Sequence, residues 1–166
     1  QFRNGATLGG SLWRRMGFSD ILTVFLAMDS YVELYKGGIV PLEEFARMPY
    51  DKDVLVRLIV KKQPGAFSYQ AVRKQRTDIP SLNCAAAQVA GEWRVVVGSR
   101  PARAVVLRDE QELLAGGITE ESAAAFADYA AGAVTVSGNM WGSVEYRRAL
   151  VPVLTRRALL ALKEVQ

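Results

Sequence analysis

The order of apolar and polar positions divides the chain into two parts, with a break at KKQPGA, residues 61–66. In the first part, Ser19 precedes an apolar run typical of a buried helix, and Gly37-Gly38 is typical of a tight hairpin turn. The pattern predicts a helix at 20–28, a hairpin at 31–42, a short helix at 41–48 and a strand at 54–60.

The second part begins with strands and ends in helices. Three runs rich in β-branched and small residues predict consecutive strands, which pair most easily as an antiparallel meander. Thr119 and Ser143 are placed to cap the last two helices, and Pro152 is expected to kink or split the final one. The predicted strands are 67–75, 83–90 and 93–100, and the predicted helices are 109–115, 120–134 and 144–165.

Composition and charge exclude several classes of function. The 166 residues carry a net charge of +4, but basic residues occur singly or in pairs, so we expect no nucleic-acid partner. The chain has no histidine, which is the usual general base. Its single cysteine, Cys84, lies in an apolar run that favours a buried small residue over a nucleophile. No run of 18 apolar residues occurs, so we expect a cytoplasmic protein without a membrane span.

The candidate chemistry lies in ATLGGSLWRRMGFSD, residues 6–20. Free backbone N–H groups at a glycine-rich turn and at a helix start can bind a phosphate, so an anion site is one interpretation. The other is a tight turn packed under a helix, with Asp20 as an ordinary first-turn acid. The dinucleotide spacing G-x-G-x-x-G and the P-loop G-K-[ST] are both absent, so the residues alone leave the two interpretations open.

Three motifs, in order, resemble those of one family. RNGATLGGSLWRRMGFSDILTVFLAMDSYVEL is similar to the second flavin-contacting segment of the FAD-binding medium subunits of molybdenum hydroxylases. This is the family of xanthine dehydrogenase and carbon monoxide dehydrogenase. RTDIPSLNCAAAQV and GSVEYRRALVPVLTRRAL resemble the strand entry and the final helix of that family's C-terminal domain. The resemblance therefore covers the whole chain.

The resemblance implies an α+β fold and a set of cofactor contacts. Residues 1–62 would form the second part of an FAD-binding domain, and residues 63–166 a C-terminal domain with a three-stranded antiparallel sheet and a helical bundle. Donors in residues 7–11 would line the FAD diphosphate and ribityl chain, and Asp20 would accept hydrogen bonds from cofactor hydroxyls. The implied cofactor-binding residues are Thr7, Leu8, Gly9, Gly10, Ser11, Asp20, Leu55 and Gln70.

The chain departs from the family pattern at three points. Ser11 stands where the family usually has asparagine, and Gln70 where a lysine is often found beside the flavin. The family's flavin subunits are also longer at the N-terminus, where a further glycine-rich segment cradles the pyrophosphate. Nothing in this chain matches that segment, so we expect only the C-terminal part of such a subunit.

The function implied by the resemblance is electron transfer. Electrons would pass from [2Fe–2S] clusters on a small subunit to FAD on this chain, and then to NAD or another acceptor. A large subunit would carry molybdopterin, and this chain would hold no catalytic residue and no metal. Arg147 and Arg148 would brace the C-terminal domain or its subunit interface. The alternatives are a truncated, flavin-free docking module of the same complex, and an unrelated α+β domain that binds a phosphate ligand.

Overall fold

The computed structural model describes residues 2–163, and within them the chain forms two antiparallel sheets and six helices. The helices are α1 (Phe2–Gly5), α2 (Leu8–Trp13), α3 (Asp20–Ala27), α4 (Leu42–Arg47), α5 (Glu120–Ala133) and α6 (Val144–Lys163). The strands are β1 (Ser30–Leu34), β2 (Gly38–Pro41), β3 (Leu55–Val60), β4 (Gly65–Val72), β5 (Leu82–Val89), β6 (Glu92–Gly98) and β7 (Val105–Arg108). The predicted α+β class is confirmed.

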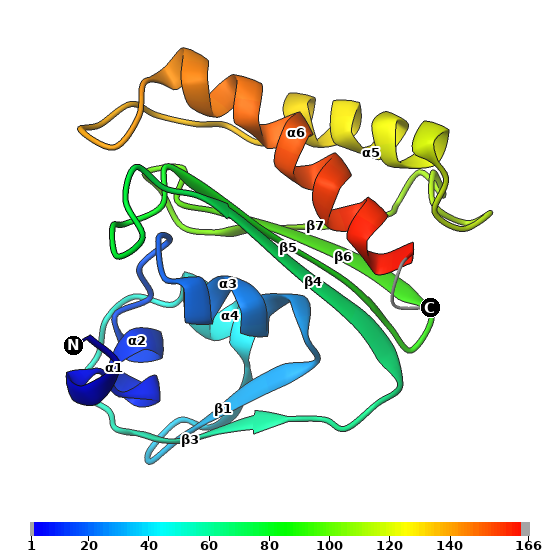
Figure 1. Ribbon diagram of the computed structural model, residues 1–166. Coiled ribbons are helices and arrows are strands. Elements are labelled where there is room, and N and C mark those ends of the chain that lie inside the picture. The colour runs from blue at the N-terminus through cyan, green and yellow to red at the C-terminus, as the bar shows by residue number, and fades with distance from the viewer. Residues whose placement is uncertain (1, 164–166) are drawn as a thin grey trace.

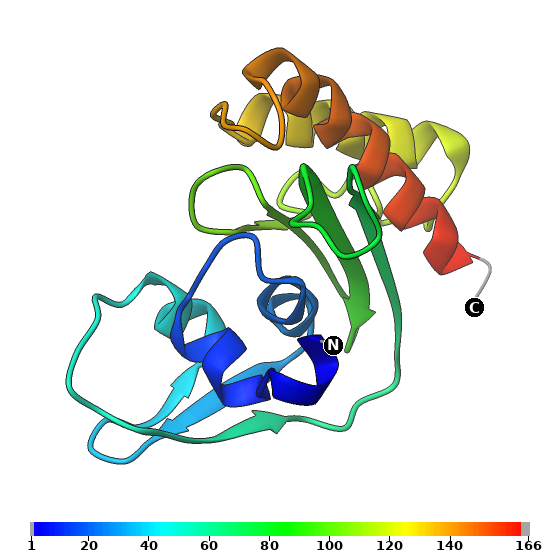
Figure 2. The same cartoon turned by 60° about the vertical axis from the view of Figure 1, so that its left-hand side comes forward.

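The elements stack in layers (Figure 1). Helices α5 and α6 cover one face of the four-stranded sheet, whose strand order is β4-β5-β6-β7. Helix α3 lies against the opposite face, and the three-stranded sheet β2-β1-β3 lies beyond it. Figure 2 shows α1 and α2 beside α3, at the end of the molecule where the N-terminus lies. Helix α3 is therefore enclosed between the two sheets.

The elements predicted for the first part are confirmed, with ends shifted by one residue at most. They are α3, the β1–β2 hairpin, α4 and β3. Ser19 caps α3, since its side chain accepts a hydrogen bond from the N–H of Leu22 at 3.2 Å. In the hairpin turn, Gly38 takes a positive φ of +69°, while Gly37 keeps an ordinary backbone conformation.

The predicted meander is confirmed as β4, β5 and β6, and the sheet gains a fourth strand, β7, that the sequence analysis missed. The helix predicted at 109–115 is wrong, because this segment is a series of turns. The carboxylate of Asp109 accepts hydrogen bonds from the N–H groups of Leu113 and Leu114 at 2.8 and 2.7 Å, and Glu112 has a φ of +55°. The side chain thus competes with helical hydrogen bonding.

The two long helices begin where the sequence predicts. A capping box holds the start of α5, where Thr119 and Ser122 exchange side chain–backbone hydrogen bonds at 2.8 and 3.1 Å. Ser143 accepts from the N–H of Tyr146 at 3.2 Å at the start of α6. This helix runs through Pro152 without interruption, so the predicted split does not occur. The last two positions of the helix predicted at 144–165 lie outside the described residues.

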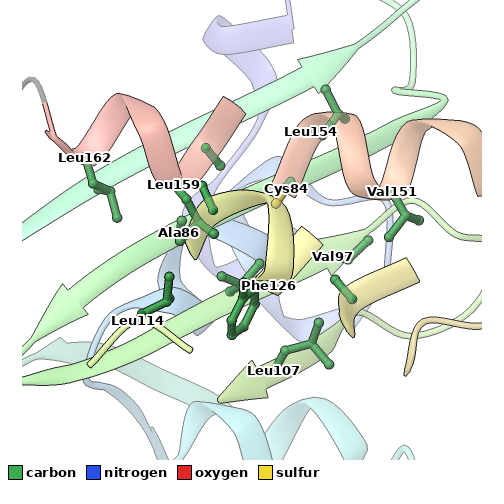
Figure 3. Close-up of a cluster of buried hydrophobic side chains, with 14 of the residues drawn as sticks. Cys84, Ala86, Val97, Leu107, Leu114, Phe126, Val151, Leu154, Leu159 and Leu162 are labelled. Atoms are coloured by element: carbon green, nitrogen blue, oxygen red, sulfur yellow. The ribbon is translucent and has the colours of Figure 1, made fainter. Parts of the chain in front are cut away.

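Strand β5 is buried on both faces and links two cores. Cys84 and Ala86 face α5 and α6, whereas Ala85 and Ala87 face α3, because side chains alternate along a strand. Figure 3 shows Cys84 among the apolar side chains of the helical layer. The thiol is fully buried, and burial raises its pKa to about 12. Cys84 is therefore a packing residue, as predicted, and not a thiolate.

Candidate functional site

A cavity of about 880 Å³ opens between the N-terminal helices and the loop that follows β4. Its walls include Thr7, Gly10, Ser11 and Asp20, which are four of the eight residues predicted to bind the cofactor. Ligand pockets commonly enclose roughly 300–1,000 Å³, so this one has room for a large organic ligand. We call it the main cavity.

The glycine-rich stretch forms the short helix α2 rather than a tight turn. Thr7 caps this helix, since its Oγ1 accepts the N–H of Gly10 at 3.1 Å. The Ser11 hydroxyl donates to the carbonyl of Thr7 at 3.0 Å. Residues three and four apart share a helix face, and Thr7, Gly10, Ser11 and Arg14 accordingly all line the main cavity.

The Asp20 carboxylate at the start of α3 is held by three donors from the second part of the chain. Its Oδ1 accepts from the Tyr69 hydroxyl at 2.5 Å and from Asn83 Nδ2 at 3.3 Å, and its Oδ2 accepts from Arg73 Nη2 at 2.7 Å. A carboxylate offers about four acceptor positions, so one remains for a ligand. The Asp20 side chain is 41% exposed. Burial and the Asp20 hydrogen bond raise the pKa of Tyr69 well above its usual value, so the phenol remains a donor.

Two glycines allow this network to form. A Cβ on Gly17 would lie 1.9 Å from the carbonyl oxygen of Ala102, and the Gly17 carbonyl accepts from the N–H of Ser99 at 2.6 Å, which fixes the segment leading into α3. A Cβ on Gly98 would lie 2.3 Å from Asn83 Oδ1 and 2.6 Å from Thr23 Oγ1. Thr23 donates to Asn83 Oδ1 at 3.3 Å, and this bond turns the amide nitrogen of Asn83 toward Asp20. Gly98 is therefore required for a close approach of backbone and side chains.

Three other predicted residues lie away from the main cavity. Leu8 and Gly9 occupy other faces of α2, and a Cβ on Gly9 would meet no atom within 4 Å. Leu55, the first residue of β3, packs partly buried against the core between the two sheets. A contact of these three residues with the cofactor stays a prediction.

Gln70 lies on the opposite face of the four-stranded sheet from Asp20. It pairs in register with Cys84, whose side chain belongs to the core under α5 and α6. Its neighbour Ser68 shares that side of β4, and the Ser68 hydroxyl donates to the carbonyl of Ala158 on α6 at 2.6 Å. The structure does not bring Gln70 to the main cavity, so its contact with a cofactor also stays a prediction.

The far wall of the main cavity comes from residues 77–80, between β4 and β5. Asp78 Oδ1 accepts from the indole N–H of Trp141 at 3.0 Å, which ties this wall to the loop before α6. Arg147 on α6 holds the same loop from beneath and is fully buried. Its guanidinium donates to the carbonyls of Ser81, Ser137 and Gly142 and to the Asn139 side chain, at 2.5–2.7 Å. The predicted bracing role of Arg147 is confirmed within the chain.

The sequence analysis missed Tyr69 and Arg73 as site residues. Tyr69 lies on the face of β4 that turns toward α3, and Arg73 directly follows the end of that strand, in the same period-two pattern of positions 69, 71 and 73. That alternation was the available signal, but the pattern alone did not say that α3 would bring a carboxylate to this face.

The chain matches two protein-family models, one for each of its two parts. Residues 67–162 match the family model of the CO dehydrogenase flavoprotein C-terminal domain. Residues 1–62 match that of the FAD binding domain in molybdopterin dehydrogenase. The chain belongs to this flavoprotein family. The resemblance carried by its three motifs is confirmed, and FAD is the cofactor of the matched binding domain.

Individual members of this flavoprotein family are distant in sequence. The medium subunit of nicotine 6-hydroxylase from Paenarthrobacter nicotinovorans is 24% identical over 174 residues, and the match covers 96% of this chain and 62% of the relative. The YgfM protein of Escherichia coli K12 is 25% identical over 154 residues, covering 92% of this chain and 56% of that protein. The chain thus spans about three fifths of the length of these curated relatives.

Solved structures share the fold. Reconstituted CO dehydrogenase from Oligotropha carboxidovorans superposes with a TM-score of 0.84 at 17% identity, covering 99% of this chain and 63% of the matched one. Quinoline 2-oxidoreductase from Pseudomonas putida 86 gives a TM-score of 0.80 at 19% identity, and the match covers 98% of this chain and 62% of the matched one.

No helix in residues 2–163 is long and apolar enough to cross a bilayer.

The residues of the main cavity fit part of an FAD molecule. The remaining acceptor position of Asp20 suits a hydroxyl of the ribityl chain, since an ionised carboxylate only accepts hydrogen bonds. Arg14 lines the same cavity and suits a phosphate. The Thr7 Oγ1 accepts from Gly10, so its own proton is available to a ligand oxygen. The flavoprotein's cavity therefore presents donors and an acceptor together, as a phosphorylated polyol requires.

Proposed function

We propose that this chain is the FAD-binding, electron-transfer component of a molybdopterin-dependent dehydrogenase or hydroxylase. The main cavity is the proposed site for the ribityl and diphosphate part of the cofactor. Family membership of both parts of the chain supports the proposal. The observation that carries it is the cavity itself, in which one face of α2 and the Asp20 carboxylate converge from separate segments.

Each proposed contact has a defined role. Thr7, Gly10 and Ser11 bring α2 close to the cofactor, with Gly10 leaving room for the approach. Asp20 accepts a ribityl hydroxyl and is kept in position by the donors Tyr69, Arg73 and Asn83. Arg14 neutralises phosphate charge at the rim. Bound FAD supplies the redox chemistry, and the chain's own residues bind and orient it.

The place of the chain in a complex follows from the same proposal. Electrons arrive from [2Fe–2S] clusters on a small subunit and leave to NAD or another acceptor, while a large subunit carries molybdopterin and binds the hydroxylated substrate. The name of the nicotine 6-hydroxylase relative, a medium subunit, supports an assembly of several subunits. The proposed setting is the cytoplasm.

A titration of the chain with FAD, followed by flavin absorbance and fluorescence, tests this proposal. The decisive comparison is between Gly10→Val and Gly132→Val, since both change an exposed glycine within a helix. Gly10 lines the main cavity, and a Cβ there would lie 3.0 Å from Thr7 Oγ1, whereas Gly132 lies on α5, away from the cavity, and its Cβ would meet no atom within 4 Å. We expect Gly10→Val to weaken FAD binding at least tenfold, equivalent to about 1.4 kcal/mol, and Gly132→Val to leave the Kd within a factor of about two.

Equal effects of the two variants would contradict the placement of FAD in the main cavity. Absence of saturable FAD binding would contradict a flavin site on this chain and favour the flavin-free docking module. Circular dichroism of each variant is the control for folding, because valine costs both helix positions the same intrinsic propensity.

A further inference from the structure

A second cavity of about 320 Å³ adjoins the main cavity. The two share Met16, Phe18, Ile79 and Pro80 in their walls, so a ligand in one lies next to a ligand in the other. We call the smaller one the side pocket. Its distinctive walls are Arg15, Tyr50, Arg103 and Trp141, and neither the family match nor the three motifs assigns it a ligand.

Arg15 is the unusual residue of the side pocket. It is only 4% exposed, and its Nη1 donates to the carbonyl of Pro49 at 3.3 Å. Its Nε and Nη2 are buried without a hydrogen-bond acceptor among the described residues. The guanidinium lies 4.0 Å from the ring centre of Phe45 and 5.1 Å from that of Tyr50, and these rings compensate part of its desolvation. They do not satisfy the two unpaired nitrogens.

The unpaired nitrogens of Arg15 define the chemistry of a partner. Nε and one Nη form the edge through which arginine binds a carboxylate or phosphate in a bidentate manner. Arg103, which is exposed, adds a second positive charge, and no aspartate or glutamate of the described residues lines the pocket. Burial lowers the pKa of Arg15, but arginine stays charged at neutral pH. Asp51, which does not line the pocket, acts on Arg15 with an opposing charge, so the two arginines leave the side pocket with a net positive charge.

The remaining walls favour an aromatic ligand. Tyr50 and Trp141 contribute rings, and Phe18 contributes a third from the wall shared with the main cavity. Tyr50 is 60% exposed and lies over the Arg15 guanidinium, and its hydroxyl donates a hydrogen bond to the carbonyl of Arg14. A ligand therefore reaches Arg15 by displacing the Tyr50 ring, which breaks that hydrogen bond. The volume lies near the lower end of the range of roughly 300–1,000 Å³ for ligand pockets, which suits a small molecule.

We propose that the side pocket binds a small aromatic anion, a planar ring that carries a carboxylate or a phosphate. Arg15 and Arg103 hold the anionic group, and Tyr50 and Trp141 pack against the ring. This site does not depend on the function proposed for the main cavity. Its anion has two candidate sources, a separate small molecule or a phosphate of FAD that reaches across the shared wall.

Isothermal titration of the chain with benzoate and with AMP tests the proposal, with benzamide and adenosine as their uncharged counterparts. We expect at least one anion to bind saturably and its uncharged counterpart at least tenfold more weakly, since a charge-assisted hydrogen bond is lost. Arg103→Gln is expected to weaken anion binding roughly tenfold, and Arg15→Gln by more. Arg148→Gln, which changes an exposed arginine on α6, is the matched control and should leave it unchanged.

Equal affinity for charged and uncharged probes, or no saturable binding of either anion, would overturn the proposal. Arg15 is buried, so Arg15→Gln could fail to fold, whereas Arg103 is exposed and its variant keeps the test decisive. If Arg103→Gln weakens AMP binding and FAD displaces AMP, the anion is the cofactor's own phosphate; if AMP and FAD bind together, it is a separate ligand. Both results support the pocket, and loss of FAD binding alone would count only against the function of the main cavity.

Discussion

The face of the four-stranded sheet that meets α5 and α6 buries mainly apolar side chains, whereas the face that meets α3 carries hydrogen bonds that end at the main cavity. Both faces use the same strands, with Cys84 and Gln70 on the first and Ala85 and Tyr69 on the second. The difference shows that one sheet can separate packing from ligand binding by the alternation of its side chains.

The two faces also use polar residues differently. Arg147 is fully buried on the helical side, and all its acceptors are neutral oxygens within the chain. Asp20 is partly exposed on the α3 side, and one of its acceptor positions remains free. A group whose hydrogen bonds are all satisfied internally stabilises the fold, while a group with spare capacity can bind a ligand.

The largest expected effect is on stability, from the packing face. Leu159→Ala removes a fully buried side chain of α6 and should lower the free energy of unfolding by about 2–5 kcal/mol, measured by urea denaturation. The FAD affinity of the folded protein should not change, because Leu159 faces the core away from the main cavity. Val153→Ala on the same helix is the control, since Val153 is 41% exposed. A large loss of FAD affinity in Leu159→Ala would break the comparison.

Much of this fold could be predicted from the sequence because its signals are local. Ser19, Thr119 and Ser143 mark helix starts through their own side chains, and each cap is present. The strand β7 was missed because four residues, between the segment that follows Pro101 and a series of turns, carry too weak a pattern. The helix at 109–115 was wrong because Asp109 bonds to the backbone instead, which composition does not reveal.

The candidate site could be predicted only in part. Asp20 and one face of α2 were identified through family motifs that lie within single segments. Tyr69, Arg73 and Asn83 reach Asp20 from 49 to 63 residues away, and no local pattern states which strand face meets α3. Gln70 shows the same limit, because the motif gave its position in β4 but not the face on which it lies. Partners far apart in sequence become visible only in the fold.

The second-largest effect is expected from Gly98, where a substitution should change both the stability and the FAD affinity. Gly98→Ala should lower the free energy of unfolding by about 1–3 kcal/mol, because its Cβ would lie 2.3 Å from Asn83 Oδ1. It should also weaken FAD binding, since Asn83 donates to Asp20. Gly116→Ala is the control, because a Cβ there meets no atom within 4 Å. Thermal unfolding combined with FAD titration measures both quantities, and a destabilised variant with unchanged affinity would contradict the link to Asp20.

A smaller effect should come from Tyr69→Phe, which removes one donor from Asp20 and leaves Arg73 and Asn83 in place. The expected loss of stability at pH 7 is about 0.5–1.5 kcal/mol. In the wild type, burial raises the folded-state pKa of Tyr69 above its ordinary value of 10.0. Above that pH the unfolded chain releases the proton first, so stability should fall as pH rises. Tyr69→Phe should show a shallower decline, and identical pH profiles would contradict the bond to Asp20.

The smallest effect should come from an ion pair that lies on neither face. Glu43 on α4 accepts from Arg108 on β7 at 2.5 Å and from Arg47 at 2.7 Å. It therefore links α4 to the edge strand β7 of the four-stranded sheet. The hydrogen bond from Arg108 lowers the pKa of Glu43 below its ordinary value of 4.5. Its contribution is therefore present above pH 4.5 and is lost as pH falls through the lowered folded-state pKa.

Glu43→Gln should accordingly lower the free energy of unfolding by at most about 1 kcal/mol at pH 7 and low salt, as expected of a pair near the surface. The difference from the wild type should shrink below pH 4.5 and in high salt, where the charge is neutralised or screened. Urea denaturation at several pH values measures it, with Glu44→Gln on the exposed side of α4 as the control. A difference that persists in acid would mean that Glu43 acts through packing, so that the edge of the sheet would belong with the packing face.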